Sequence, residues 1–131
     1  MAARCAEQLN AHKLEVETAH GVSAHVFSLD LTAEVGAADL HAQIKAAGLS
    51  VDILINNAGF GRQGEFVERS LEVDLGMIDL NVKALVADDM IEQGSGKILH
   101  VDSTAGFMLG PLQATYFATK AFVNSFSQAL D

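Results

Sequence analysis

The sequence predicts a parallel α/β fold. Three short apolar runs, residues 23–29, 51–55 and 97–101, have the composition of β-strands. Helical patterns separate these runs along the chain. Because strands that alternate with helices are joined by right-handed crossovers, we expect the strands to lie parallel, with helices packed on the sheet. The length of 131 residues suits one domain with one core, and the sequence contains no repeat or linker.

The first half of the chain begins with a helical pattern over residues 2–18, which precedes the first strand. The next helix follows Asp30-Leu31-Thr32, with Thr32 as its expected N-cap and Gly48 as its end. The run 51–55 is short and mostly apolar, which is typical of a strand buried on both faces of a parallel sheet.

Two longer helical patterns fill the second half of the chain. Ser70 is placed to cap the first of them, and a Gly-Ser-Gly sequence at 94–96 ends it. Its expected inward face carries Leu71, Leu75, Ile78, Val82 and Leu85. The last helix covers residues 116–130, and its expected core-facing side chains are Phe117, Ala121, Phe122 and Phe126.

Composition argues against several classes of function. The chain has 8 basic and 17 acidic side chains and a formal charge of −9, which disfavours non-specific binding to nucleic acid or to an anionic membrane. Its single cysteine, Cys5, gives no disulfide framework or Cys-based zinc cluster, and the histidines lack His-x-x-x-His spacing, so we expect no metal. We find no signal peptide or membrane-spanning stretch and expect a cytoplasmic protein.

One glycine-rich motif matches a dinucleotide-binding fingerprint in its letters. Gly59, Gly61 and Gly64 have the G-x-G-x-x-G spacing, and Asp79 lies twenty residues after Gly59. The acidic residue of that fingerprint should end a second strand, whereas Asp79 falls inside a helical pattern. We therefore interpret residues 59–64 as a glycine-rich loop.

A hydroxyl, a phenol and an ammonium group occur in one stretch, at Ser103, Tyr116 and Lys120. Tyr116 is the only tyrosine in the chain, and it shares a helix face with Lys120, four residues later. A lone Tyr-x-x-x-Lys pair is most often a surface pair. Here, however, Ser103 follows a predicted buried strand, where ligands meet a parallel sheet, and Asn81 lies in the preceding helix.

Together these pieces resemble the short-chain dehydrogenase/reductase family. The matching pieces, in family order, are Asp30-Leu31-Thr32, Asn56-Asn57-Ala58-Gly59, Asn81, Ser103 and Tyr116-x-x-x-Lys120, and they cover essentially the whole chain. The resemblance implies a partial Rossmann-type, doubly wound parallel sheet, built from the family's third, fourth and fifth strands with flanking helices. It also implies an NAD(P)-dependent oxidoreductase that acts on a small-molecule carbonyl or alcohol substrate.

The resemblance implies a role for each catalytic residue. Tyr116 would be the general acid in carbonyl reduction and the general base in alcohol oxidation, and the ammonium of Lys120 would favour its phenolate form. Lys120 would also hold the nicotinamide ribose. Ser103 would hydrogen-bond the substrate oxygen, and Asn81 would hold a water that links Lys120 to solvent. The hydride comes from the cofactor.

Family resemblance also suggests residues for the rest of the cofactor. It places Asn57 beside the adenosine ribose and Asp30 at the adenine edge, although a turn asparagine and a helix-entry acid explain these two residues equally well. Arg4 stands where relatives often bind the 2′-phosphate of NADP, and a solvated terminal arginine is nearly as good an interpretation. On that residue we favour NADP over NAD.

The chain departs from the family pattern at both ends. It lacks the Gly-rich strand–turn–helix that cradles the cofactor pyrophosphate, and it stops before the family's later strands. We therefore expect the middle of a larger enzyme, with residues 1–131 as an incomplete NAD(P)-binding domain. In this interpretation 23–29 has lost its neighbouring strand. We expect 51–55 to pair with 97–101, and 23–29 to be displaced, re-paired with 51–55 or held by a partner chain.

An internal difference falls between Asn81 and Ser103. Relatives carry roughly six more residues there, about a turn and a half of helix, and the gap lies near residues 86–88. We expect the shortened helix to strain, unwind or shift. Because this helix builds the oligomer interface in many relatives, any homo-oligomer would have an altered interface.

Two functions remain open at this point. The first is a nicotinamide-dependent reductase or dehydrogenase, with little or no activity in the isolated chain because the pyrophosphate-binding element is missing. The second is a non-catalytic product, either a truncated remnant or a chain that binds a partner through its open sheet edge. The apolar stretch 105–112 and the loop 60–66 suggest a non-ionic substrate.

Overall fold

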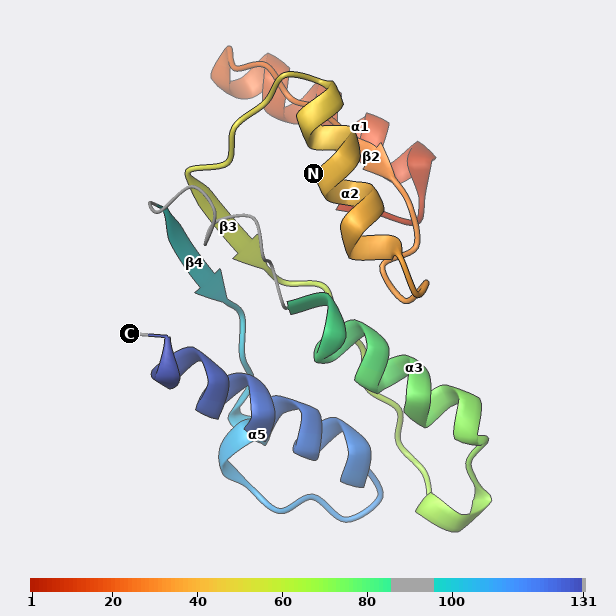
Figure 1. The fold of residues 1–131 in the computed structure, drawn as a ribbon. Helices are drawn as coiled ribbons and strands as arrows, with labels where there is room; N and C mark the ends of the chain where they lie inside the picture. Colours follow the sequence, from red (N-terminus) through yellow and green to blue (C-terminus); the bar gives the residue numbers. More distant parts are fainter. Residues whose placement is uncertain (86–95, 131) are drawn as a thin grey trace. The chain divides into compact units, whose positions relative to one another are not determined.

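A computed structural model describes residues 1–85 and 96–130 (Figure 1). The chain divides into two compact units, Met1–Ser50 and Val51–Asp131. Each unit contains a two-stranded parallel sheet with its own helices, so the predicted α/β class with parallel strands is confirmed. No helix in the described part of the chain is long and apolar enough to cross a membrane.

The sheet of the first unit pairs β1 (Ala2–Ala3) with β2 (Phe27–Ser28), and α1 (Ala6–His20) connects the two strands. The N-terminal ammonium of Met1 donates to the carbonyl of His25 over 2.7 Å. The prediction that the chain begins in a helix and that 23–29 lacks a neighbouring strand is therefore wrong. Backbone groups at the first residues supply the neighbour, and a pair of alanines is too short to show strand alternation.

The second helix of this unit starts later than predicted. Asp30 Oδ1 accepts hydrogen bonds from both the N–H of Thr32 (2.9 Å) and the hydroxyl of Thr32 (2.7 Å). Thr32 is therefore a donor in an Asx-type turn and not an N-cap, and α2 spans Gly36–Ala46. The predicted end of this helix at Gly48 is close to the observed end, and Gly48 has a left-handed φ of 68°.

The sheet of the second unit pairs β3 (Ile53–Asn56) with β4 (Lys97–His100), as the sequence predicts. The register joins Ile53 to Lys97 and Asn56 to His100. The expected burial of this strand on both faces is wrong, because Ile53 is 62% exposed and Ile55 is 59% exposed. The two helices of this unit pack mainly against each other and against the segment after β4.

The first of these helices is α3 (Leu71–Asn81), and Ser70 is its N-cap as predicted, with its Oγ accepting from the N–H of Glu72 over 3.3 Å. The helix ends sooner than the sequence pattern suggests. A short 3-10 turn, η2 (Lys83–Leu85), follows it. The predicted shortening near residues 86–88 lies outside the described residues.

The inward face of α3 differs from the predicted one. The buried residues are Asp74, Met77 and Asn81, whereas three residues of the predicted apolar face are exposed: Leu71, Leu75 and Ile78. Polar partners elsewhere in the unit determine this choice, since Arg69 pairs with Asp74 and Thr119 binds Asn81. Apolar spacing within the helix carries no information on such partners.

The second helix is α5 (Ala114–Ala129), which packs against α3 and against the 3-10 helix η3 (Thr104–Phe107) (Figure 1). Another 3-10 helix, η1 (Phe66–Glu68), precedes α3. The buried residues of α5 are Thr119 and Val123, so the predicted aromatic core face is only partly right. Phe122 is 40% exposed and stacks on Phe126 with ring centroids 5.5 Å apart.

Candidate active site

The carboxyl ends of β3 and β4 lie at one edge of the sheet, and a predicted site residue follows each strand. Asn57 comes directly after β3 and is exposed, while Ser103 is half-buried at the start of η3. The Oγ of Ser103 accepts from the N–H of Ala105 over 3.2 Å, as an N-cap does. Because a serine hydroxyl has one O–H and two lone pairs, its O–H is left to donate to a ligand.

Lys120 joins α5 to the end of β4. Its Nζ donates to the carbonyl of Val101 over 2.9 Å, and Val101 stands two residues before Ser103. Backbones also approach closely here, because a β-carbon at Gly106 would lie 2.9 Å from the carbonyl oxygen of Lys120. The segment that carries Ser103 and the helix that carries Lys120 are therefore held together, and the ammonium keeps two further N–H groups.

Tyr116 lies one helical turn before Lys120 on α5 and is half-buried. Its ring packs against the backbone of Gly61, where a β-carbon would lie 2.9 Å from both Cγ and Cδ2 of the ring. The ring of Phe117 meets it edge-on, with centroids 6.2 Å apart. Since glycine alone leaves this space open, Gly61 allows the loop after β3 to lie on the face of the phenol.

Asn81 is 2% exposed, and both polar atoms of its side-chain amide are hydrogen-bonded. Its Oδ1 accepts from the N–H of Phe60, and its Nδ2 donates to the carbonyl of Phe60 and to Oγ1 of Thr119, each over 3.0 Å. Thr119 in turn donates to the carbonyl of Tyr116 over 2.8 Å. Both amide N–H groups are engaged, so only acceptor atoms of Asn81 remain to bind a water. The role of Asn81 in holding that water stays a prediction.

Thr119 is a site residue that the sequence analysis missed. It is 3% exposed and lies between Tyr116 and Lys120 on α5. A threonine in a helix more often faces solvent or bonds its own backbone, so its position carries no signal by itself. Only the packing of α3 on α5 reveals that it links Asn81 to the backbone of Tyr116.

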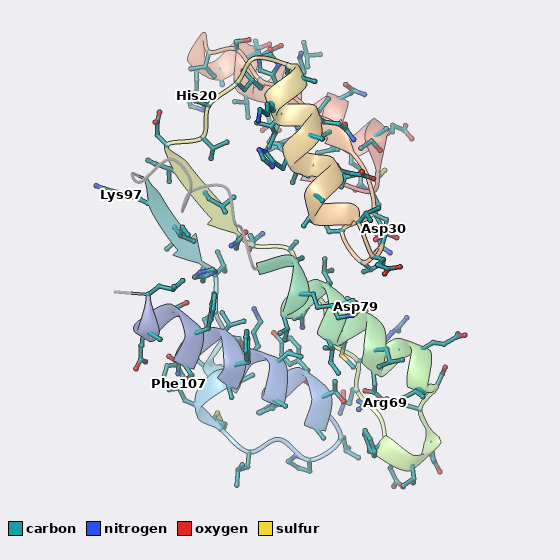
Figure 2. All side chains as sticks on the ribbon, viewed as in Figure 1. His20, Asp30, Arg69, Asp79, Lys97 and Phe107 are labelled. Carbon is teal, nitrogen blue, oxygen red and sulfur yellow. The ribbon has the colours of Figure 1, made fainter. Side chains whose placement is uncertain are left out.

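The glycine-rich loop after β3 is not a dinucleotide fingerprint, as the sequence analysis concluded. No α-helix starts directly after Gly64, since the next element is the short 3-10 helix η1, and α3 begins only at Leu71. Asp79 lies within α3 (Figure 2). It pairs with Lys83 one turn later.

The remaining predicted residues, Asp30 and Arg4, belong to the first unit. Arg4 directly follows β1 and Asp30 lies two residues after β2, so both follow the carboxyl ends of paired parallel strands. Hydrogen bonds from the hydroxyl and then from the N–H of Thr32 lower the pKa of the Asp30 carboxyl, and the charge of Arg4 adds a smaller effect in the same direction. Both side chains are exposed.

His100 is the last residue of β4, three residues before Ser103. The amide Nδ2 of Asn56 lies 3.3 Å from Nδ1 of His100, within hydrogen-bond distance. The Nε2 of His100 is buried and has no hydrogen-bond partner in the described part of the chain. The ring meets Phe126 edge-on, and burial lowers the pKa of His100.

Comparison with known proteins decides the family. The family model of the short chain dehydrogenase matches residues 1–131. The chain belongs to the short-chain dehydrogenase family. It is 34% identical over 141 residues to the very-long-chain 3-oxoacyl-CoA reductase of Macaca fascicularis, a match that covers 97% of this chain and 43% of that protein. The chain thus spans less than half the length of this relative.

Solved structures of short-chain dehydrogenases share the fold. The bulky-bulky ketone specific alcohol dehydrogenase from Comamonas testosteroni has a TM-score of 0.86 and 31% identity, over 99% of this chain and 54% of that chain. A short-chain dehydrogenase from Sphingobium yanoikuyae, solved in complex with NADPH, has a TM-score of 0.84 and 33% identity, over 98% of this chain and 53% of that chain. The predicted Rossmann-type fold class and family resemblance are confirmed.

Proposed function

We propose that this protein is an oxidoreductase that transfers a hydride between NADP(H) or NAD(H) and a carbonyl or alcohol substrate. The observation that carries the proposal is the bond between Lys120 and the carbonyl of Val101. It joins the helix of Tyr116 to the strand end that leads to Ser103. This contact supports an arrangement in which a phenol, an ammonium and a serine hydroxyl act together at the carboxyl ends of parallel strands, where this kind of fold binds its ligands.

The residues of the site suit proton transfer to a carbonyl oxygen. Tyr116 is the proton donor in reduction and the acceptor in oxidation, a contribution of roughly 10²–10⁴ in rate for a positioned acid or base. Ser103 donates its O–H to the substrate oxygen and stabilises the charge that develops there.

The donor set also fits a nicotinamide dinucleotide phosphate. Lys120 has two N–H groups beyond its bond to Val101, which suit ribose hydroxyls, and the exposed Asn57 follows the adjacent strand. Within the first unit, family resemblance alone assigns Asp30 and the exposed guanidinium of Arg4 to the adenosine end of the cofactor, with Arg4 at its 2′-phosphate. The cofactor, when bound, supplies the hydride. The NADPH complex of the similar Sphingobium yanoikuyae protein supports this cofactor class.

A carbonyl compound with a large apolar group is the substrate class that we favour. Exposed apolar side chains follow Ser103, with Phe107 72% exposed, Met108 62% and Leu109 98%. Figure 2 shows Phe107 at η3. Similar proteins named for very-long-chain 3-oxoacyl-CoA and for bulky ketones agree with this preference.

A chimera tests the proposal within a complete fold. This chain replaces the matched region of the Sphingobium yanoikuyae dehydrogenase, and NADPH oxidation is measured with ketones that carry small or bulky apolar groups. We expect turnover that favours bulky ketones and that falls in Ser103→Ala and Lys120→Met variants. A chimera that folds and binds NADPH but reduces none of these ketones would instead favour a non-catalytic function.

Cofactor preference has its own test. Titration calorimetry compares the affinity of the chimera for NADPH and NADH, with and without the Arg4→Ala change. We expect Arg4→Ala to weaken NADPH binding by about tenfold, since it removes one charged partner of a phosphate, and to leave NADH binding unchanged. Equal effects on the two cofactors would remove the assignment of Arg4 to the 2′-phosphate.

A further inference from the structure

Arg69 makes contacts that the proposed chemistry does not explain. Its side chain is 8% exposed and lies beside the start of α3 (Figure 2). Nη1 donates to the carbonyl of Arg62 over 2.9 Å and to the carbonyl of Leu112 over 3.3 Å, and Nη2 donates to Oγ1 of Thr115 over 3.4 Å. One guanidinium therefore binds the loop after β3, the loop before α5 and the first turn of α5.

Asp74 neutralises this buried guanidinium. Its Oδ1 lies 2.8 Å from Nη2 of Arg69, and its side chain is 7% exposed. The contact is close but poorly aligned as a hydrogen bond, and Nε of Arg69 has no hydrogen-bond partner in the described residues. The ring of Phe66, 6.0 Å from the guanidinium carbon, adds a second favourable contact for the cation. The charge is thus held at this place by electrostatics, while the N–H groups bind the loops.

The loop before α5, which Arg69 binds through Leu112, leads directly into the helix of Tyr116. Leu112 has a φ of 66°, and it is the one non-glycine residue with positive φ in the described part of the chain. Such a conformation persists only where the surroundings fix it. Two donors fix the carbonyl of Leu112: Arg69 and the N–H of Gly64, the latter over 2.8 Å.

The loop after β3, which Arg69 binds through Arg62, lies on the ring of Tyr116. The carbonyl of Arg62, which Arg69 holds, belongs to the residue after Gly61. Gly61 is in turn packed against the phenol ring. Arg69 therefore restrains both the backbone that leads into Tyr116 and the backbone that covers its ring.

We propose that Arg69 is a positioning residue that holds the phenol of Tyr116 in its working orientation, with Asp74 keeping the guanidinium in place. The inference rests on the acid/base role of Tyr116 under the proposed function. Arg69 acts through Leu112 and the loop at Gly61, without contact to substrate or cofactor.

Paired variants separate this role from a general contribution to stability. Arg69→Met alone leaves the carboxylate of Asp74 buried without its partner, which destabilises the fold whatever else Arg69 does. The double variant Arg69→Met/Asp74→Leu removes both charges, an exchange that folds tolerate well, but it still lacks the donors to the two loops. Arg69→Lys keeps the charge and loses the planar set of donors. Arg62→Met is the control, because only the main chain of Arg62 takes part.

Tyr116 reports its own environment, because the chain has one tyrosine and no tryptophan. The measurement is acrylamide quenching of tyrosine fluorescence in the 131-residue chain, with urea unfolding recorded for each variant. We expect the quenching constant to rise about twofold in the double variant and in Arg69→Lys, since both release the loops that shield the ring. The Arg62→Met control should match the wild type.

A folded double variant with wild-type quenching would overturn the proposal, because Arg69 would then serve only to pair with Asp74. Should the double variant fail to fold, the same comparison with Arg69→Lys decides the matter. Quenching requires no turnover, so it tests the role of Arg69 separately from the proposed oxidoreductase function. Absence of activity in the wild-type chimera would refute the proposed function, while the quenching result alone confirms or refutes the role of Arg69.

Discussion

Nδ2 of Asn81 donates to Oγ1 of Thr119 over 3.0 Å, and this buried bond joins α3 to the helix that carries Tyr116 and Lys120. The same threonine hydroxyl donates to the carbonyl of Tyr116 over 2.8 Å. Because polar groups buried this deeply are costly unless they are bonded, the hydroxyl of Thr119 satisfies the amide of Asn81 while its own O–H is satisfied by the carbonyl of Tyr116. The helix bearing the proposed acid is thereby fixed to its neighbour through polar contacts.

Replacing Thr119 tests this link. Thr119→Val keeps the shape of the side chain but leaves an N–H of Asn81 buried without an acceptor, so we expect a loss of about 1–3 kcal/mol in the free energy of unfolding. Thr119→Ser keeps the hydroxyl and should lose less, because only a methyl group is removed. Urea denaturation measures both. Equal stability of the two variants would show that the hydroxyl bonds contribute little.

Gly61 should tolerate no side chain. A β-carbon there would lie 2.9 Å from two ring atoms of Tyr116, so Gly61→Ala must displace the ring or the loop, at a cost of about 1–3 kcal/mol. We also expect the near-ultraviolet circular dichroism of the single tyrosine to change.

Gly76→Ala is the matched control for that substitution. It lies inside α3, and its added methyl would meet Phe60 at an ordinary 3.5 Å. Alanine is the better helix former by about 0.5–1 kcal/mol, so this variant should be more stable than the wild type. If Gly61→Ala behaved in the same way as Gly76→Ala, the close packing of the loop on Tyr116 would be refuted.

His100 should make the stability of the fold depend on pH. Burial lowers its pKa in the folded protein, whereas in the unfolded chain it titrates at about 6.5. Below that pH the unfolded state binds the extra proton first, so the free energy of unfolding falls as pH decreases and levels off beneath the lowered pKa. Urea denaturation across this range should show the fall in the wild type and a smaller one in His100→Gln. The exposed His25→Gln variant serves as the control, and a fall of unchanged size in His100→Gln would contradict the assignment.

The sequence predicts the elements of this structure better than it predicts their contacts. Strands 51–55 and 97–101 are visible as apolar runs, and their parallel pairing follows from the helices between them. Ser103, Tyr116 and Lys120 are recognisable because their spacing lies within a single stretch of the chain. Each of these signals is local.

Long-range polar contacts account for what the sequence analysis missed. Asn81 and Thr119 are 38 residues apart, and Arg69 and Leu112 are 43 apart, so no window of periodicity contains both partners. These bonds turn a polar stripe of α3 inward, against the apolar pattern that predicted the opposite face. The pairing of Ala2–Ala3 with β2 was missed for a related reason, since it is made by backbone groups of the first residues.

The central claim is that Tyr116 moves the proton in a hydride-transfer reaction, and Tyr116→Phe tests it most directly. The change removes a single oxygen and leaves the ring packing on Gly61 intact. In the NADPH-binding chimera, we predict that kcat for ketone reduction falls by roughly 10²–10⁴ while the affinity for NADPH stays within about twofold of the unmodified chimera. A Tyr116→Phe chimera that binds NADPH and keeps its full kcat would contradict the account.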